Sequence, residues 1–297
     1  MSPPEVDVPG PASAVAAVIV SYNVRDLLLV CVDSLRQEGI DHIVVVDNAS
    51  VDGSADAVRG QPGVEVVALA RNLGFGSAAN RGVARTVTPY VAVMNPDVVV
   101  EPGATKALVA TLEGDAGLAV VGPRIETLDG RLYPSVRTFP DLTDAAGHAF
   151  LHFVWPDNPF SRRYRMLDWD HALAADVDWV AGTYFLARRR AWDEVGGFDE
   201  RFFMYLEDVD LCWRLRRGGW RTGYQPAAVV THAIGRSTDQ TPYRMIAAHH
   251  RSLLRYAAKT TTGRQRLLLP VMALALVLRT VLAWAQRAAR GRPHAAP

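Results

Sequence analysis

The sequence has little cysteine: only Cys31 and Cys212 occur in 297 residues. Both lie in apolar patterns of helical spacing, and their separation fits no metal-binding motif. The disulfide framework that stabilises many small secreted domains is therefore excluded. We expect both thiols to be core residues of a protein from a reducing compartment.

The sequence also lacks the glycine-rich signatures of two common nucleotide sites. Its first apolar run continues as "VIVSYNVRDL", where a dinucleotide fingerprint would need glycines. No phosphate-loop lysine motif occurs either. These absences argue against a sugar dehydrogenase that uses a nicotinamide cofactor.

Basic residues are absent from the first 14 positions of the chain, and acidic residues are scarce in its last 62. The first 14 residues are rich in proline and acidic, unlike a signal peptide, so we expect a disordered leader at residues 1–13. Residues 236–297 hold 11 Lys and Arg against the single acid Asp239, whereas the preceding 235 residues have a net charge of −9. This asymmetry favours an acidic surface or a phosphorylated partner for the C-terminal part.

One long hydrophobic run, residues 267–286, lies in this basic part and is about long enough to cross a bilayer as a helix. Pro270 and Arg279 weaken a spanning arrangement. The pattern favours a helix that lies in the membrane interface, with its apolar side down and its arginines on anionic lipid. A buried core helix or a homodimer contact is the alternative.

Residues 15–114 contain apolar runs of Val, Ile, Leu and Ala that alternate with short helical patterns. Such runs are typical of strands buried on both faces of a parallel sheet, whose ligands bind beyond the carboxyl ends of the strands. Polar residues follow the four predicted strands: Ser21, Tyr22 and Asn23; Asp47 and Asn48; Arg71 and Asn72; Asn95, Pro96 and Asp97. We therefore predict a nucleotide site there, although turn chemistry alone also favours such residues.

The second half is less regular. Residues 125–140 predict a hairpin with an Asp-Gly turn, and residues 155–176 predict a loop over the site. Residues 176–189 predict a strand that Gly182 interrupts, which indicates a close approach of the backbone to another group.

Three carboxylates follow a run of large apolar side chains: Glu207, Asp208 and Asp210. Helical spacing places Asp208 on the inward stripe of the next helix. It places Asp210 with Arg214 on another face, which we expect to be solvated and to hold an i,i+4 ion pair. An acid on the buried side of a helix is costly unless another group pairs with it or it takes part in the function of the protein. A plain acid in a first helical turn, favoured by the helix dipole, is the alternative for Asp208.

Several motifs then occur in a fixed order: "VIVSYN", "VVDNASVDGS", "RNLGFGSAANRG", "MNPDV", "WVAGTYFLARR", "GGFDERFFMYLEDVDLCWRLRRGG" and "TH" followed by "GRST". Together they resemble the family 2 glycosyltransferases of the GT-A fold, and more narrowly the bacterial rhamnosyltransferase branch. The resemblance covers residues 15 to about 260.

The resemblance implies an α/β fold of GT-A type, in which helices flank a Rossmann-like, mostly parallel sheet and an amphipathic helical extension follows. It implies a nucleotide-sugar-binding half at 14–122 and an acceptor-binding and catalytic half at 123–260. A membrane-associating helix and tail would occupy 261–297.

The resemblance also implies roles for single residues. Asp208 would be the catalytic base, with Glu207 beside it. Asp97, the last acid of the family's DxD motif, and His232 would hold a divalent metal, Mg²⁺ or Mn²⁺, while Asn95 replaces the motif's first acid. The nucleotide sugar would contact the following residues: Ser21, Tyr22, Asp47, Arg71, Asn80, Asn95, Asp97 and Gly182.

The implied reaction is an inverting, metal-dependent transfer of L-rhamnose from dTDP-L-rhamnose to N-acetylglucosaminyl-diphosphoryl-polyprenol, in synthesis of the cell-wall arabinogalactan linker. The chemistry agrees, because one carboxylate suffices to deprotonate the acceptor hydroxyl and a hard cation stabilises a leaving diphosphate. The enzyme would be cytoplasmic and peripheral at the inner face of the plasma membrane, without a nucleic-acid partner. The alternatives are transfer of another sugar, such as galactofuranose or glucose from a UDP-sugar, for O-antigen or exopolysaccharide, and a non-catalytic nucleotide-sugar-binding scaffold.

Overall fold

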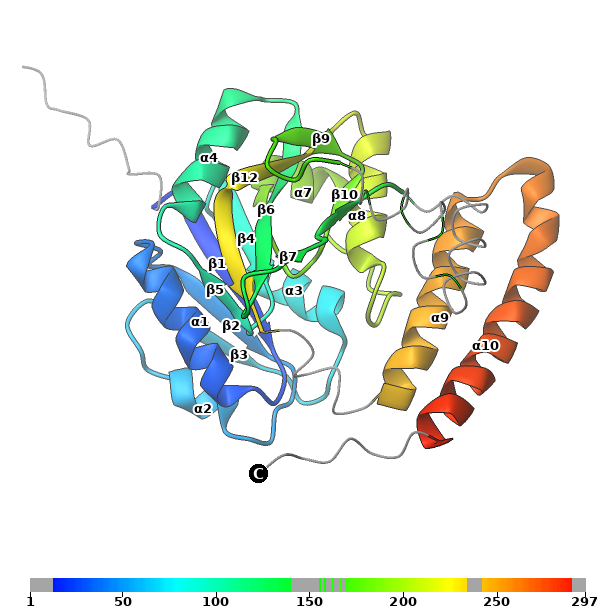
Figure 1. Cartoon of the computed structure of the whole chain (residues 1–297). Coiled ribbons are helices and arrows are strands. Elements are labelled where there is room, and N and C mark those ends of the chain that lie inside the picture. Colours follow the sequence, from blue (N-terminus) through cyan, green and yellow to red (C-terminus); the bar gives the residue numbers. More distant parts are fainter. Residues whose placement is uncertain are drawn as a thin grey trace, which may run out of the picture.

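The computed structural model describes residues 13–139, 169–233 and 242–289, together with Trp155, Asn158, Arg162 and Met166. These residues form a ten-stranded sheet flanked by helices, and a pair of long C-terminal helices lies at one side of it (Figure 1). The leader expected at residues 1–13 and much of the loop expected at 155–176 lie outside the described residues.

The first half of the chain forms the parallel sheet that its apolar runs predict. Its strands pair in the order β3-β2-β1-β4. They are β1 (Val15–Ser21), β2 (Ile43–Asp47), β3 (Val64–Ala68) and β4 (Tyr90–Met94), connected by helices α1 (Arg25–Gln37), α2 (Ser54–Val58) and α3 (Phe75–Val83). The carboxyl ends of these strands therefore meet at one edge, as expected.

The second half adds antiparallel pairings, so the whole sheet is mixed. Strand β11 (Tyr184–Arg188) runs antiparallel to both β4 and β6 (Leu118–Thr127), and β12 (Arg221–His232) runs parallel to β6. The predicted hairpin is confirmed, because β7 (Leu132–Tyr133) pairs with β6 across a turn at Gly130, whose φ is 76°. The other short strands are β8 (Val136–Arg137), β9 (Ala175–Val177) and β10 (Trp179–Val180).

Residues 90–100 form two strands, β4 and β5 (Val98–Val100), on either side of a turn. The chain turns at Asn95–Asp97, and the following strand β5 crosses to the far end of the sheet, where it pairs with β12. The polar residues Asn95 and Asp97 break the apolar run, and the turn carries them to the edge of the sheet.

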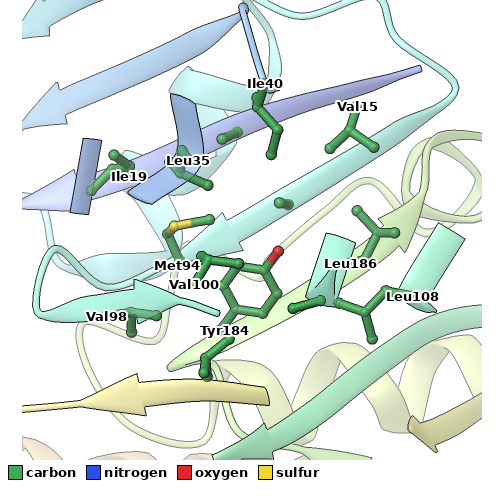
Figure 2. Close-up of a cluster of buried hydrophobic side chains, with 14 of the residues drawn as sticks. Val15, Ile19, Leu35, Ile40, Met94, Val98, Val100, Leu108, Tyr184 and Leu186 are labelled. Carbon is green, nitrogen blue, oxygen red and sulfur yellow. The ribbon is translucent and has the colours of Figure 1, made fainter. Parts of the chain in front are cut away.

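Two apolar clusters cover the two faces of the sheet. Alternate side chains of β1 belong to the two clusters: Ala17 and Ile19 lie in one, and Val18 and Val20 lie in the other. Figure 2 shows the first cluster, in which Tyr184 and Met94 of the central strands pack with side chains of α1 and of α4 (Ala104–Gly114). Both cysteines are buried free thiols, as predicted.

The remaining helices belong to the second half of the chain. They are α7 (Arg189–Val195), α8 (Glu207–Arg217), α9 (Pro242–Thr260), the short η2 (Gly263–Leu268) and α10 (Leu269–Ala289). Figure 1 shows α9 and α10 as an antiparallel pair, with α9 on the side of α8 and the sheet. Helix α10 thus leaves its outer side exposed.

Candidate functional site

The pairing of β5 with β12 brings Asp97 and His232 together. Val98 lies opposite His232 in this antiparallel pair, and the N–H of Ala233 donates a hydrogen bond of 3.0 Å to the carbonyl of Asp97. As a result, Nε2 of His232 lies 3.2 Å from Oδ1 of Asp97, and both side chains are only 7% exposed. Residues 135 positions apart in the chain therefore form one buried polar pair.

This pair has the properties of two metal ligands. Despite their proximity, Oδ1 of Asp97 makes no hydrogen bond to any described residue, and neither does Nδ1 of His232. A buried carboxylate oxygen without a donor is costly, and two ligands of an octahedral divalent ion lie about 3.0 Å apart. No group of three or more His, Cys, Asp or Glu side chains suited to a metal occurs in the described part of the chain. The pair therefore fits an ion that takes its other ligands from a bound substrate.

The loop before α8 presents two neighbouring carboxylates. Tyr205 and Leu206 have φ angles of 66° and 62°, a left-handed conformation that strains residues other than glycine. Helix α8 begins directly after them, so its first turn carries Glu207 and Asp208 at the cleft. Oδ2 of Asp208 accepts a hydrogen bond of 2.8 Å from the N–H of Gly182. The close approach predicted at Gly182 is thus an approach to this carboxylate.

The two neighbouring carboxylates both have a raised pKa, but their surroundings differ. Burial raises the pKa of Glu207 well above its usual range, and the charge of Asp208 raises it further. Burial also raises the pKa of Asp208, although N–H groups of Gly182 and Val209 and the charge of Arg137 oppose this rise. Oε2 of Glu207 has no hydrogen-bond donor among the described residues. Asp208 is therefore the member of the pair with groups around it that favour a carboxylate.

Both sets of residues line one cleft of about 370 Å³, a size typical of ligand sites. Asp97 and His232 lie in the same cavity wall as the turn at Asn95, while Glu207 and Asp208 lie at the start of α8. The cleft therefore combines a candidate metal pair with a pair of neighbouring carboxylates, of which Asp208 is half-buried.

The structure brings most of the predicted site residues to this cleft. Those that line it are Tyr22, Asn95, Asp97, Gly182, Glu207, Asp208 and His232. Ser21 and Asp47 lie opposite each other in the β1–β2 pair and are buried, and Oγ of Ser21 and Oδ1 of Asp47 make no hydrogen bond to described residues. Both are the last residues of their strands, and neither lines the cleft.

Two further predicted residues, Arg71 and Asn80, also lie outside the cleft lining. Arg71 is exposed. The amide of Asn80 is occupied by the backbone of Phe198, because it donates to the carbonyl and accepts from the N–H, each at 2.9 Å. In this structure Asn80 ties α3 to the loop before α8.

Sequence reasoning missed several residues of the cleft. Asn48 and Asn72 follow strands as expected, but turn chemistry hides their role, and the side chain of Asn48 also bonds the backbone at Leu73 and Gly74. Tyr133, Arg137, Arg244 and His249 also line the cleft. No local pattern distinguishes these four, because long-range packing brings them to the site.

The second face of α8 is not solvated, contrary to expectation. Asp210 is fully buried, and its carboxylate lies 2.7 Å from Arg214 and 2.6 Å from Lys259 of α9. Arg214 also donates to the carbonyls of Val195 and Gly197. The i,i+4 ion pair is present as predicted, but α9 and the loop before α8 cover it.

Comparison with known proteins identifies close relatives. The sequence profile described as "Glycosyltransferase like family 2" matches residues 11–252. The N-acetylglucosaminyl-diphospho-decaprenol L-rhamnosyltransferase of Mycobacterium tuberculosis is 38% identical over 242 residues, which cover 77% of this chain and 78% of that protein. Rhamnosyltransferase WbbL of Escherichia coli is 28% identical, over 57% of this chain and 62% of that protein.

A solved structure shares the fold. The mannosyltransferase PcManGT from Pyrobaculum calidifontis, in complex with GDP-Man and Mn²⁺, matches with a TM-score of 0.58 at 17% identity. The match covers 98% of this chain and 80% of that protein.

Proposed function

This chain belongs to glycosyltransferase family 2 and has the GT-A fold, and we propose that it transfers L-rhamnose from dTDP-L-rhamnose to N-acetylglucosaminyl-diphosphoryl-polyprenol. The observation that carries the proposal is the 38% identity to a mycobacterial L-rhamnosyltransferase named for that class of acceptor, across 77% of this chain. The product would serve as the linker of arabinogalactan in the cell wall.

Asp97 and His232 are the residues that would hold a divalent cation, Mg²⁺ or Mn²⁺. Nε2 of His232 faces Oδ1 of Asp97 in a buried wall of the cleft, that oxygen has no hydrogen-bond partner among the described residues, and Asn95 lies in the same turn as Asp97. When bound, such a cation offsets the negative charge that builds on a departing diphosphate. The complex of PcManGT with a nucleotide sugar and Mn²⁺ supports the choice of a divalent ion for this fold.

The donor's nucleoside would bind at the ends of β1 and β2. Tyr22 and Asn48 line the cleft there. Ser21 and Asp47 precede them in the chain, and each has a buried polar atom without a hydrogen-bond partner among the described residues. A pyrimidine base presents N–H and carbonyl groups that such atoms can bind. Arg71, which is exposed, would contact the nucleotide only if the donor extends over the rim of the cleft.

Asp208 would take the proton from the acceptor hydroxyl. As the O–H bond breaks, the oxygen attacks the anomeric carbon, and the bond to the departing dTDP breaks on the opposite face, which inverts the configuration. A retaining double displacement would need a second ionised carboxylate as nucleophile. Glu207 does not suit that role, because burial raises its pKa well above the usual range and so disfavours the carboxylate form.

Helix α10 would hold the enzyme at the membrane surface. The described chain contains one helical stretch long and apolar enough to cross a bilayer, Gly263–Ala288, and only 6% of its apolar window is buried. Exposed arginines Arg264 and Arg266 precede α10 and would meet anionic headgroups. Arg279 is different from what the sequence predicts, because it is half-buried on the side of α9. Burial lowers the pKa of His250 on α9, and the charge of Arg279 lowers it further. The outer side of α10 is thereby left apolar.

A donor and acceptor panel tests the reaction. Full-length protein is incubated with dTDP-L-rhamnose, UDP-galactofuranose or UDP-glucose, each with and without N-acetylglucosaminyl-diphosphoryl-polyprenol, in the presence of Mg²⁺ or Mn²⁺. We expect glycolipid product from dTDP-L-rhamnose alone. Product from a UDP-sugar instead would replace the donor, and binding of dTDP-L-rhamnose without any product would favour a non-catalytic scaffold.

Vesicle flotation tests the membrane surface. Leu274→Glu and Leu278→Glu on the outer side of α10, where these side chains are 61% and 62% exposed, should reduce binding to vesicles that contain anionic lipid. Val51→Glu is the matched control, since Val51 is 91% exposed but lies far along the chain, between β2 and α2. Equal flotation of all variants would exclude α10 as the membrane contact.

A further inference from the structure

The cleft is lined by three basic side chains that the proposed mechanism does not use. Arg137 comes from β8, and Arg244 and His249 come from α9. Arg244 is exposed and forms no ion pair with a described residue. Basic side chains gathered in one cavity are typical of a site for an anion.

Two of these side chains, Arg137 and His249, are tied to the part of the cleft that holds Asp208. Burial raises the pKa of Asp208, and the charge of Arg137 opposes this rise. The ring of His249 packs edge-on against Tyr205, with 5.3 Å between ring centroids, and Oγ of Ser252 donates to the carbonyl of Met204 at 2.9 Å. Helix α9 is therefore fastened to the loop that leads into the first turn of α8.

The proposed function already provides a binding site for one anion, the diphosphate of the donor. Asp97 and His232 suit a cation that would balance the diphosphate of the donor, and they need no further basic residues to do so. The acceptor must approach Asp208, because a general base has to touch the hydroxyl that it deprotonates. An acceptor with its own diphosphate brings a second set of negative charges to this side.

We infer that Arg137, Arg244 and His249 form a subsite for the diphosphate of the lipid-linked acceptor, which places the acceptor sugar between this subsite and Asp208. The inference rests on the proposed function and adds to it the residues that recognise the acceptor. Guanidinium groups suit this task, since they donate several hydrogen bonds in a plane to phosphate oxygens.

The position of α9 explains how one acceptor can reach both the cleft and the membrane. On its other side α9 holds α10, because Nδ1 of His250 lies 2.7 Å from Oγ1 of Thr280, and Trp284 donates to the carbonyl of Tyr243 at 3.1 Å. Figure 1 shows the two helices side by side along their length. The polar diphosphate and the lipid chain of one acceptor would thus meet opposite sides of a single helical pair.

The test measures the preference for a diphosphate. Wild-type protein, Arg244→Gln and His249→Gln are assayed with dTDP-L-rhamnose and two acceptors: N-acetylglucosaminyl-diphosphoryl-polyprenol and an alkyl glycoside of N-acetylglucosamine without phosphate. Arg251→Gln is the matched control, since Arg251 is an exposed arginine two turns farther along α9 and does not line the cleft. Arg137 is left intact because it also acts on Asp208.

We expect the ratio of kcat/KM for the diphosphate acceptor to that for the glycoside to fall about 10- to 100-fold in Arg244→Gln and in His249→Gln, as for the loss of one charged hydrogen bond. The KM for dTDP-L-rhamnose and the ratio in Arg251→Gln should not change. An unchanged ratio in both cleft variants would overturn the subsite, and a rise in the donor KM alone would reassign these residues to the donor. Wild-type protein that is inactive with both acceptors would instead overturn the proposed function itself, and the subsite with it.

Discussion

The two walls of the cleft are held in place by different forces. Asp97 and His232 lie on the sheet wall, where the backbone hydrogen bonds between β5 and β12 set their separation. Glu207 and Asp208 lie on the helix wall, where two left-handed residues precede α8 and side-chain ion pairs anchor it. The candidate metal pair is thus built from backbone register, whereas the position of the candidate base depends on side chains from distant segments.

The helix wall carries backbone strain directly before α8. The left-handed conformations of Tyr205 and Leu206 each cost about 1–3 kcal/mol. The ion pairs of Asp210 with Arg214 and Lys259 offset this cost, because they join α8 to α9 and to the preceding loop. A substitution on this wall should therefore affect folding and catalysis together more often than one on the sheet wall.

Loss of the base should produce the largest effect. Asp208→Asn keeps the shape of the side chain, but it retains only one of the two hydrogen bonds that the carboxylate accepts from Gly182 and Val209, and it cannot accept the proton of the acceptor. We expect kcat to fall by about two to four powers of ten, with unchanged affinity for dTDP. Calorimetric titration with dTDP serves as the control, and a variant that keeps more than a tenth of the wild-type rate would remove Asp208 from this role.

Removal of one ion-pair partner should weaken the helix wall. Lys259→Met leaves a buried oxygen of Asp210 without its ammonium partner at 2.6 Å, so we expect the free energy of unfolding to fall by about 1.5–3 kcal/mol. Chemical denaturation gives this value. Lys106→Met, which removes an exposed lysine on α4, is the control, and equal stability of the two variants would show that the ion pair does not anchor α8.

A change on the sheet wall should leave stability intact. His232→Gln retains the backbone pairing of β5 with β12 but removes an imidazole ligand. We expect the gain in dTDP affinity on addition of Mn²⁺ to shrink about 10- to 100-fold, with the melting temperature of the ligand-free protein unchanged. A metal-dependent gain in dTDP affinity equal to that of the wild type would show that His232 does not bind the cation.

The smallest effect concerns the protonation of Glu207. Its pKa is raised in the folded state, so the folded protein binds more protons than the unfolded chain above the ordinary glutamate pKa, and stability is lost as the pH rises through that range. Glu207→Gln should flatten this decline, by about 1.4 kcal/mol for each unit by which the pKa is raised. Unfolding measured from pH 5 to pH 8 checks this, with the exposed Glu113→Gln as the control. A decline as steep as that of the wild type would mean that Glu207 is ionised when folded.

Much of the sheet wall was predictable from the sequence, because buried parallel strands are continuous apolar runs with polar residues at their ends. Tyr22, Asn95 and Asp97 were found in this way and do line the cleft. The helix wall was predictable only in part. Helical spacing alone assigned Asp210 to a solvated face, since it contains no information about which distant helix will cover that face.

The sequence by itself determined the alternation of strands and helices, the family, and the identity of the acid that opens α8, because these depend on local periodicity and on contiguous motifs. Only the tertiary structure decided that Asp97 meets His232, that burial raises the pKa of Glu207, and that α9 brings Arg244 and His249 to the cleft. Those outcomes depend on strand register, burial and helix packing, which join residues that are far apart along the chain.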